Sequence, residues 1–132
     1  MSELSSSLVH SVSADFFLGS GIAVTMKECF IKERIWELRR RHYNIGDVVA
    51  VRHRNRYVFN LVVKELYFLK PSYFTLRKSL QTLKKNLIKL NVKHLSMPKI
   101  SCGLDKLDFN FVLKILYQTF ADTDIRISIF YL

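Results

Sequence analysis

Two loops rich in small residues are placed to hold an anionic ligand. The first contains Gly19-Ser20-Gly21 and the second Ser101-Cys102-Gly103, and each runs between a predicted strand and a predicted helix. Glycine lets the backbone pass close to a ligand, and the start of a helix directs N–H groups and a partial positive charge at an anion. The two loops together favour a pyrophosphate between them, because open α/β sheets bind ligands at the carboxyl ends of strands. A G-x-G sequence alone also suits a plain tight turn.

Two charged residues near these loops are candidates for catalysis. Lys64 ends the apolar run Leu61-Val62-Val63, where partial desolvation favours the free amine and makes it a nucleophile. Asp105 follows the second loop and suits a general acid/base. Each also has a structural explanation, as a solvated strand-end lysine and as a helix N-cap. Asp108 is the better cap for a helix that starts near Phe109, which leaves Asp105 available for chemistry.

Cysteine and metal chemistry find little support in the sequence. Cys29 and Cys102 are the only cysteines, too few for a disulfide framework or a four-cysteine zinc site. Cys102 with His10 or His94 is an alternative thiol hydrolase pair, but no flanking pattern supports it. We expect no metal and no cofactor. The low cysteine count indicates a reducing compartment, so an intracellular protein of the nucleus or cytoplasm is expected.

The composition indicates one globular domain with an excess of positive charge. The chain has 132 residues, of which 49% are hydrophobic and 24% charged, enough apolar material for one core. Its start lacks a signal-peptide pattern and no apolar run is long enough to span a bilayer, so no membrane partner is expected. The formal net charge of +10 favours polyanionic partners such as nucleic acid, although it also suits a solubilising surface.

Hydrophobic periodicity places the candidate residues on alternating strands and helices. Residues 1–7 are expected to be disordered. Strands are predicted at Leu8–Ser13, Val48–Val51, Tyr57–Val63, His94–Met97 and Ile125–Leu132. Helices are predicted at about Ile22–His42, after Pro71 and Ser72 to about Leu90, and at about Phe109–Ala121. The second helix carries an apolar stripe of Leu76, Leu80, Leu83, Leu87 and Leu90. The order βαββαβαβ predicts a single α/β domain over residues 1–132, whose central mixed sheet is covered on both faces.

Several stretches of the chain resemble one known protein family. They are His10-Ser11-Val12-Ser13-Ala14-Asp15, Gly19-Ser20-Gly21-Ile22-Ala23-Val24, Lys70-Pro71-Ser72-Tyr73, Leu95–Leu107 and Thr123–Ile127. The stretch SMPKI-x-CGLD-x-L within Leu95–Leu107 is quite specific, whereas the glycine loop is not. Over about Leu8–Leu132 the chain resembles the macrodomains, specifically the terminal ADP-ribose protein glycohydrolases, which are O-acetyl-ADP-ribose deacetylase-like.

The resemblance implies a three-layer α/β/α fold with ADP-ribose lying across the top of the sheet. In that family the glycine loop holds the pyrophosphate and the distal ribose, and the second loop closes over the same groups. The residues that the resemblance implies for ligand binding are Ser13, Asp15, Gly19, Ser20, Gly21, Ile22, Lys99, Ile100, Ser101, Cys102, Gly103, Leu104 and Leu132. No metal is needed.

The resemblance also implies an activity. The family's lysine that matches Lys64 attacks the anomeric carbon of the distal ribose and displaces the carboxylate of a modified glutamate or aspartate. The aspartate that matches Asp105 assists this step and the hydrolysis of the lysine adduct. The implied function is removal of mono-ADP-ribose from acidic side chains of proteins, with O-acetyl-ADP-ribose as a further substrate, in the reversal of ADP-ribosylation and the DNA damage response.

The expected partners follow from that activity and from the charge. They are ADP-ribose, mono-ADP-ribosylated proteins and, through the positive charge, poly(ADP-ribose) or nucleic acid. The alternative function is a non-catalytic module that binds ADP-ribose or its polymer.

The chain departs from the family pattern at its start. Family members begin with a further strand and a Gly-Asp loop whose aspartate binds the adenine amine, whereas residues 1–7 are too short and polar to supply them. Ser101 stands where the family usually has glycine, and Cys29-Phe30-Ile31 replaces a glycine-containing segment. In the family's strand order the first strand covers the C-terminal strand. Its absence predicts an exposed apolar edge at Ile125–Tyr131. We therefore expect the chain to self-associate through this edge, or to be less stable and to bind ADP-ribose more weakly than full-length relatives.

Overall fold

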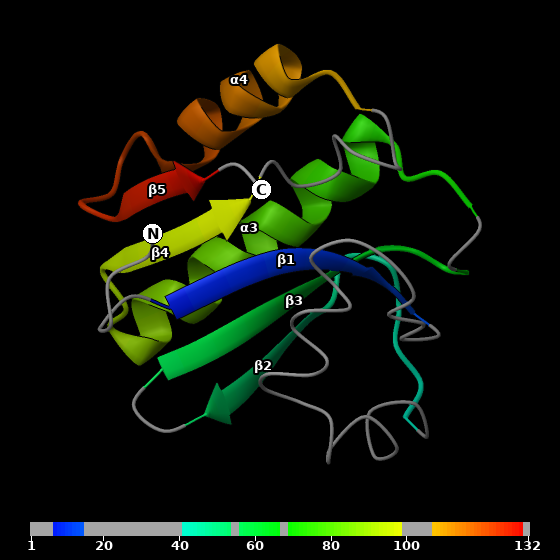
Figure 1. The fold of residues 1–132 in the computed structure, drawn as a ribbon, viewed down its shortest axis with the longest axis horizontal. Helices are drawn as coiled ribbons and strands as arrows, with labels where there is room; N and C mark the ends of the chain where they lie inside the picture. The colour runs from blue at the N-terminus through cyan, green and yellow to red at the C-terminus, as the bar shows by residue number, and fades with distance from the viewer. Residues whose placement is uncertain (1–6, 15–40, 54–55, 67–68, 99–106, 131–132) are drawn as a thin grey trace.

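A computed structural model describes residues 7–14, 41–53, 56–66, 69–98 and 107–130, which contain five strands and two helices. In chain order these are β1 (Ser7–Ser13), β2 (Val48–His53), β3 (Arg56–Lys64), α3 (Tyr73–Leu90), β4 (His94–Pro98), α4 (Phe109–Phe120) and β5 (Arg126–Phe130) (Figure 1).

The strands form one mixed sheet in the order β2-β3-β1-β4-β5. β1 runs parallel to both of its neighbours, β3 and β4, and β5 runs parallel to β4. β2 pairs antiparallel with β3. The carboxyl ends of β1, β3, β4 and β5 therefore lie together at one end of the sheet, which we term the carboxyl edge. The α/β class and the mixed sheet expected from the sequence are confirmed.

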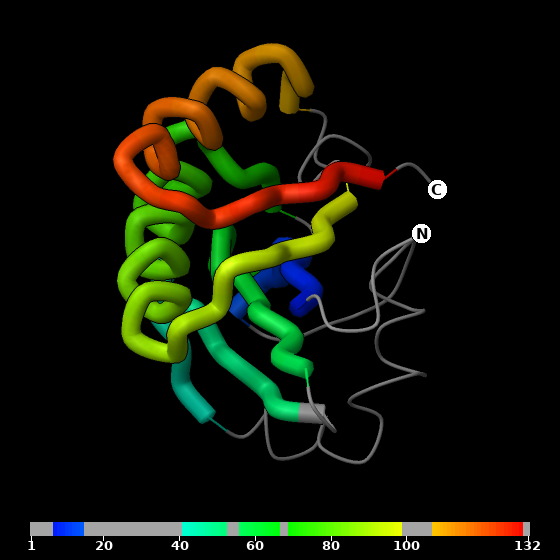
Figure 2. The backbone as a smooth tube through the Cα atoms, turned by 90° about the vertical axis from the view of Figure 1, so that its left-hand side faces the viewer, coloured from blue at the N-terminus to red at the C-terminus, as the bar shows by residue number. Residues whose placement is uncertain are grey.

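Helices α3 and α4 cover one face of the sheet (Figure 2). α3 is preceded by Ser72, whose hydroxyl accepts a hydrogen bond from the Thr75 N–H while the Thr75 hydroxyl accepts one from the Ser72 N–H. Four leucines of the predicted stripe are fully buried, namely Leu76, Leu80, Leu83 and Leu87. The fifth, Leu90, is 37% exposed. At 3.6 residues per turn it falls at the margin of the stripe, in the last residue of the helix.

The central strands are buried on both of their faces. Alternation along β1 and β3 directs Val9, Phe59 and Leu61 into the hydrophobic core beneath the two helices. Val58 and Val62 belong to the opposite face and are also fully buried. The helix predicted over about residues 22–42, which the predicted fold places on that second face, lies outside the described residues except at its last two positions.

Some predicted boundaries are wrong by a few residues. β1 starts at Ser7, whose side chain is buried, so this residue does not belong to a disordered leader. Arg41 and His42 are not helical, because the chain there already leads into the turn 44–47. That turn is closed by the Asp47 carboxylate, which accepts a hydrogen bond of 2.8 Å from the Asn44 N–H.

Candidate functional site

The carboxyl edge contains a topological switch point between β1 and β4. The chain leaves β1 towards β2 and β3 and leaves β4 towards β5, on opposite sides of this parallel pair. Open α/β sheets bind ligands at such a point, outside the carboxyl ends of the strands. The two predicted ligand loops follow directly along the chain, since β1 ends at Ser13 and β4 at Pro98. The candidate site therefore lies at the ends of β1, β3 and β4.

A β-bulge brings Lys64 next to the end of β1. The two strands pair in register from Leu8 opposite Val58 to Val12 opposite Val62, after which Ser13 lies opposite Lys64. One extra residue of β3, Val63, is accommodated at this step. Beyond it the Ala14 N–H donates a hydrogen bond of 2.8 Å to the Lys64 carbonyl. Bulges re-aim side chains beside active sites, and this one sets Lys64 at the carboxyl edge.

The carbonyl of Val62, the residue before the bulge, is hydrogen-bonded both by the turn before β2 and by α3. The Val62 carbonyl accepts a hydrogen bond of 2.8 Å from the Gly46 N–H. The Ser79 hydroxyl of α3 lies 3.0 Å from the same oxygen and 3.0 Å from the Thr75 carbonyl. Ser79 is fully buried. Ser79 is not among the residues predicted from the sequence, although a serine one residue before Leu80, on the buried side of a leucine stripe, is a signal that could have identified it.

A buried polar pair joins β1 and β3 on the face opposite α3 and α4. His10 Nε2 lies 2.5 Å from Asn60 Oδ1, and the Asn60 amide donates to the Val49 carbonyl at 2.9 Å. Because Asn60 Oδ1 can only accept, the Nε2 of His10 carries the proton. Burial lowers the pKa of His10 to about 4, against a weaker opposing effect of the Asn60 hydrogen bond. His10 is thus a neutral histidine within the sheet.

Comparison with known proteins identifies this arrangement. No family model matches the chain. The chain is 40% identical over 124 residues to a bovine protein named ADP-ribose glycohydrolase OARD1. The aligned residues make up 94% of this chain and 80% of the relative. It superimposes on the macrodomain of Mycobacterium tuberculosis DarG with a TM-score of 0.85 at 21% identity, over 96% of this chain and 88% of the other. A Thermosipho africanus DarTG structure in complex with ADP-ribose gives a TM-score of 0.81 at 16% identity. This superposition covers 96% of this chain and 38% of the DarTG chain. The chain belongs to the macrodomain family.

Most of the predicted site residues of this macrodomain lie outside the described part of the chain. The structure brings Ser13 and Lys64 together at the carboxyl edge. The positions outside it are Asp15, Gly19, Ser20, Gly21, Ile22, Lys99, Ile100, Ser101, Cys102, Gly103, Leu104, Asp105 and Leu132. Their roles remain predictions.

The start of α4 is fixed in the way that the sequence predicts. Asp108 is the N-cap of the helix, and its carboxylate accepts a hydrogen bond of 2.8 Å from the Asn110 N–H. The Asp108 N–H in turn donates to the Tyr73 hydroxyl at 2.9 Å. Tyr73 is the first residue of α3, so the chain emerging from the second ligand loop is tied to that helix. Capping of α4 therefore does not require Asp105.

The two histidines considered for a thiol hydrolase are both placed unfavourably. His10 is engaged inside the sheet with Asn60. His94 is the first residue of β4, at the end opposite the carboxyl edge, and its Nε2 lies 2.9 Å from the Ser128 hydroxyl. Cys102 follows the other end of β4 in the chain. This alternative gains no support from the macrodomain's geometry.

The residues of the macrodomain that the structure describes contain neither a metal-ligating cluster nor a membrane-spanning helix. Within those residues no group of three or more histidine, cysteine, aspartate or glutamate side chains is arranged to hold a metal ion. Among the same residues, no helix has both the length and the apolar character needed to cross a membrane.

Proposed function

We propose that this macrodomain is a glycohydrolase that releases mono-ADP-ribose from acidic side chains of proteins. The observation that carries the proposal is the position of Lys64, which ends β3 opposite Ser13 at the edge where open α/β sheets bind ligands. The relative at 40% identity, named as an ADP-ribose glycohydrolase, supports the same reaction class. The Thermosipho africanus DarTG structure, which was solved in complex with ADP-ribose, supports ADP-ribose as the ligand.

In the proposed reaction Lys64 is the nucleophile and Asp105 the acid/base. The Lys64 amine attacks the anomeric carbon of the distal ribose, and the bond from that carbon to the carboxylate oxygen of the modified residue breaks. The carboxylate leaves with the bonding electrons, while Asp105 takes the proton from the attacking amine. In the second step Asp105 returns that proton to the lysine nitrogen as the bond to the anomeric carbon breaks, and it takes a proton from the water that attacks this carbon. The free amine is restored and ADP-ribose is released.

The finer assignments belong to the same proposal. O-acetyl-ADP-ribose carries an ester on the same ribose, so we include it as a second substrate. We place the protein in the nucleus or cytoplasm, acting on mono-ADP-ribosylated proteins in the DNA damage response. The lysine chemistry written above for the release of ADP-ribose needs no metal or cofactor.

The second candidate is a module that binds ADP-ribose without cleaving it. The structural neighbour solved in complex with ADP-ribose supports this alternative as well, because a complex requires binding and not cleavage. Two measurements on the same protein separate the candidates. Calorimetric titration with ADP-ribose tests binding, and release of ADP-ribose from an automodified polymerase tests turnover. Binding with turnover supports the hydrolase, binding alone supports the module, and absence of binding contradicts both.

A further inference from the structure

The outer surface of α3 carries an aligned set of one aromatic and three basic side chains. Phe74, Lys78, Lys85 and Lys89 follow one another at spacings of four, seven and four residues. At 3.6 residues per turn these positions fall on one side of the helix. All four are exposed. We term this set the α3 ridge, and it runs about 22 Å at a rise of 1.5 Å per residue.

The ridge is positive, and no acidic residue of α3 offsets it. The helix contains five basic residues and no aspartate or glutamate. The two that lie outside the ridge turn towards α4, where Arg77 donates to Gln118 at 3.0 Å and Lys84 pairs with Asp122 at 2.6 Å. Within the described residues, no ion pair engages a ridge lysine. The charge of the ridge therefore faces solvent.

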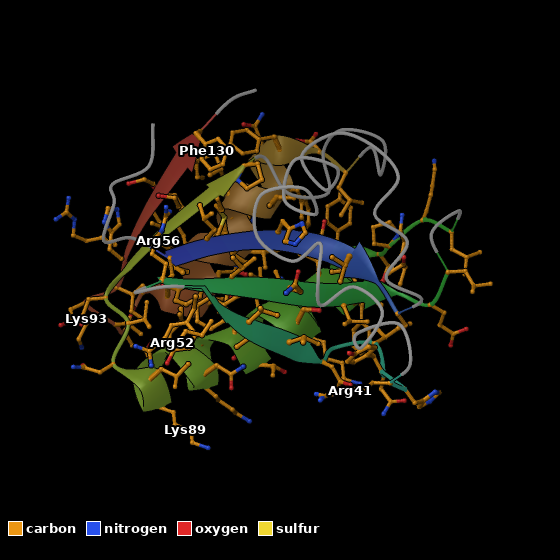
Figure 3. The ribbon with its side chains drawn as sticks, turned by 60° about the horizontal axis from the view of Figure 1, so that its bottom comes forward. Arg41, Arg52, Arg56, Lys89, Lys93 and Phe130 are labelled. Atoms are coloured by element: carbon orange, nitrogen blue, oxygen red, sulfur yellow. The ribbon has the colours of Figure 1, made fainter. Side chains whose placement is uncertain are left out.

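The ridge borders β2, which adds further positive charge. The aliphatic stem of Lys78 packs over Gly46, in the turn before β2, so closely that a Cβ at Gly46 would lie 2.8 Å from the lysine chain. Arg52 is exposed on β2. Figure 3 shows Arg52 and Arg56 towards the same end of the molecule as Lys89, where α3 ends. Positive charge therefore also lies beyond the ridge, towards the end of the molecule where α3 ends.

Phe74 gives the ridge a second property. Its ring is 74% exposed, one helical turn before Lys78. The aromatic contact at this end of the helix is made instead by Tyr73 and Phe111, whose ring centres are 4.6 Å apart. One exposed apolar side chain needs no explanation by itself. A ring aligned with a row of lysines, however, is the combination that stacks a base while the phosphates are neutralised.

We propose that the α3 ridge binds single-stranded nucleic acid, with Lys78, Lys85 and Lys89 at successive phosphates and Phe74 stacked on an unpaired base. The ridge shares no residue with the candidate site at the carboxyl edge. Nucleic-acid binding and ADP-ribose binding are therefore separable, and this inference does not rest on the proposed glycohydrolase activity. A duplex offers no unpaired base to Phe74, so the proposal distinguishes the two forms of nucleic acid.

The test is fluorescence anisotropy with a labelled single-stranded oligonucleotide of about 12 nucleotides, within the range of known single-strand sites. Wild-type protein is titrated over a series of salt concentrations. We expect Lys85→Gln and Lys89→Gln each to reduce the salt dependence by about 0.7 in the logarithmic slope, the loss of one phosphate contact. The matched control is Lys114→Gln, which removes an exposed lysine from α4 and should leave the slope unchanged.

The ring is tested separately from the charge. Phe74→Ala should weaken binding of the single strand about tenfold and leave binding of the same sequence as a duplex unchanged. Thermal melts and ADP-ribose titration should match wild type for every variant, because the altered side chains are exposed and none of them belongs to the candidate site. Three results would overturn the proposal: no single-strand binding by wild type, equal losses in the Lys114→Gln control, or an unaffected Phe74→Ala variant. Tighter binding of duplex or poly(ADP-ribose) than of the single strand would also overturn it.

Discussion

Lys64 lies opposite Ser13 in the parallel pair of β1 and β3. This pairing results from a register shift in which Val63 is an extra residue of β3. Without the bulge, Ser13 would face Val63, and Lys64 would pair one position further on. The lysine proposed as nucleophile is thus set by the strands themselves, since its backbone carbonyl is bonded to the Ala14 N–H. Side chains held on regular elements keep their geometry better than those on loops.

Replacing Lys64 by alanine should abolish hydrolysis and leave ADP-ribose binding within a few-fold of wild type. The amine is the attacking group in the proposed reaction, whereas the ligand's pyrophosphate is expected to bind the loops. Turnover is measured on a mono-ADP-ribosylated protein and binding by calorimetry. Lys70→Ala, an exposed lysine beyond β3, is the matched control and should keep its rate. Unchanged turnover in Lys64→Ala would remove the nucleophile assignment.

Alanine variants of Asp105 and Asp108 should distinguish a catalytic role from a helix-capping role. Asp105→Ala is expected to lower the rate by about 10²-fold, the usual effect of losing an acid/base group, with little change in melting temperature. Asp108→Ala removes the observed N-cap of α4 and should cost about 1 kcal/mol of stability without a comparable loss of rate. Kinetics and thermal melts on both variants decide the matter. A reversed pattern would show that Asp105 is structural.

The Ser79 hydroxyl should contribute to holding the bulge. Ser79→Ala leaves the Val62 carbonyl bonded to Gly46 but removes the contact from α3, so we expect a loss of about 1 kcal/mol in the free energy of unfolding. The rate of hydrolysis should fall as well, because Lys64 follows the loosened segment. Thr82→Ala is the control, since that hydroxyl bonds only within α3, to Lys78 at 3.3 Å. Equal effects in urea titrations of both variants would show that the contact is unimportant.

The sequence predicted the elements whose signals are local. The leucine spacing of α3, the alternation in β1 and the aspartate before α4 each depend on neighbours within a few residues, and the structure contains all three elements. Lys64 was recognisable because it ends an apolar run. Its position at the end of β3 agrees with the predicted strand, whereas its place next to β1 was not predicted.

The features that the sequence did not predict depend on contacts between distant elements. The bulge at Val63 exists because β1 and β3, about fifty residues apart, shift register, and no local pattern encodes this. Ser79 gains its role from the carbonyl that happens to lie across from it. Ser7 is ordered because its neighbours in the sheet bury it, although its local sequence is polar. The burial of His10 likewise arises from pairing with Asn60 on another strand.

The β5 edge should promote self-association. Among the described strands β5 is outermost and pairs on one side only, with β4. It carries Ile127 and Ile129 at half-buried positions and a single charge at Arg126. Light scattering over a range of concentrations should show growing association, and Ser128→Lys, a charge at an exposed edge position, should suppress it. A wild-type protein that stays monomeric throughout would contradict the prediction.

The stability of the fold should fall as the pH drops from about 6.5 to 4, because His10 is buried as a neutral residue. Burial lowers its pKa from 6.5 to about 4, so in this window the unfolded chain binds a proton that the folded protein does not. Stability from this group is therefore complete above pH 6.5 and is lost progressively towards pH 4. The total loss is about 3 kcal/mol, from 1.36 kcal/mol per pH unit.

A variant that keeps the hydrogen bond but cannot titrate isolates this effect. Gln at position 10 can donate to Asn60 as His10 does, so His10→Gln should retain the fold with a nearly flat stability between pH 6.5 and 4. The carboxylates of Asp122 and Asp124 contribute equally in both proteins. Their pKa values are lowered by hydrogen bonds from Lys84 and Lys93, and they titrate below this window. Urea unfolding at half-unit pH steps measures the difference. Parallel losses in wild type and His10→Gln would mean that His10 is not held neutral by burial.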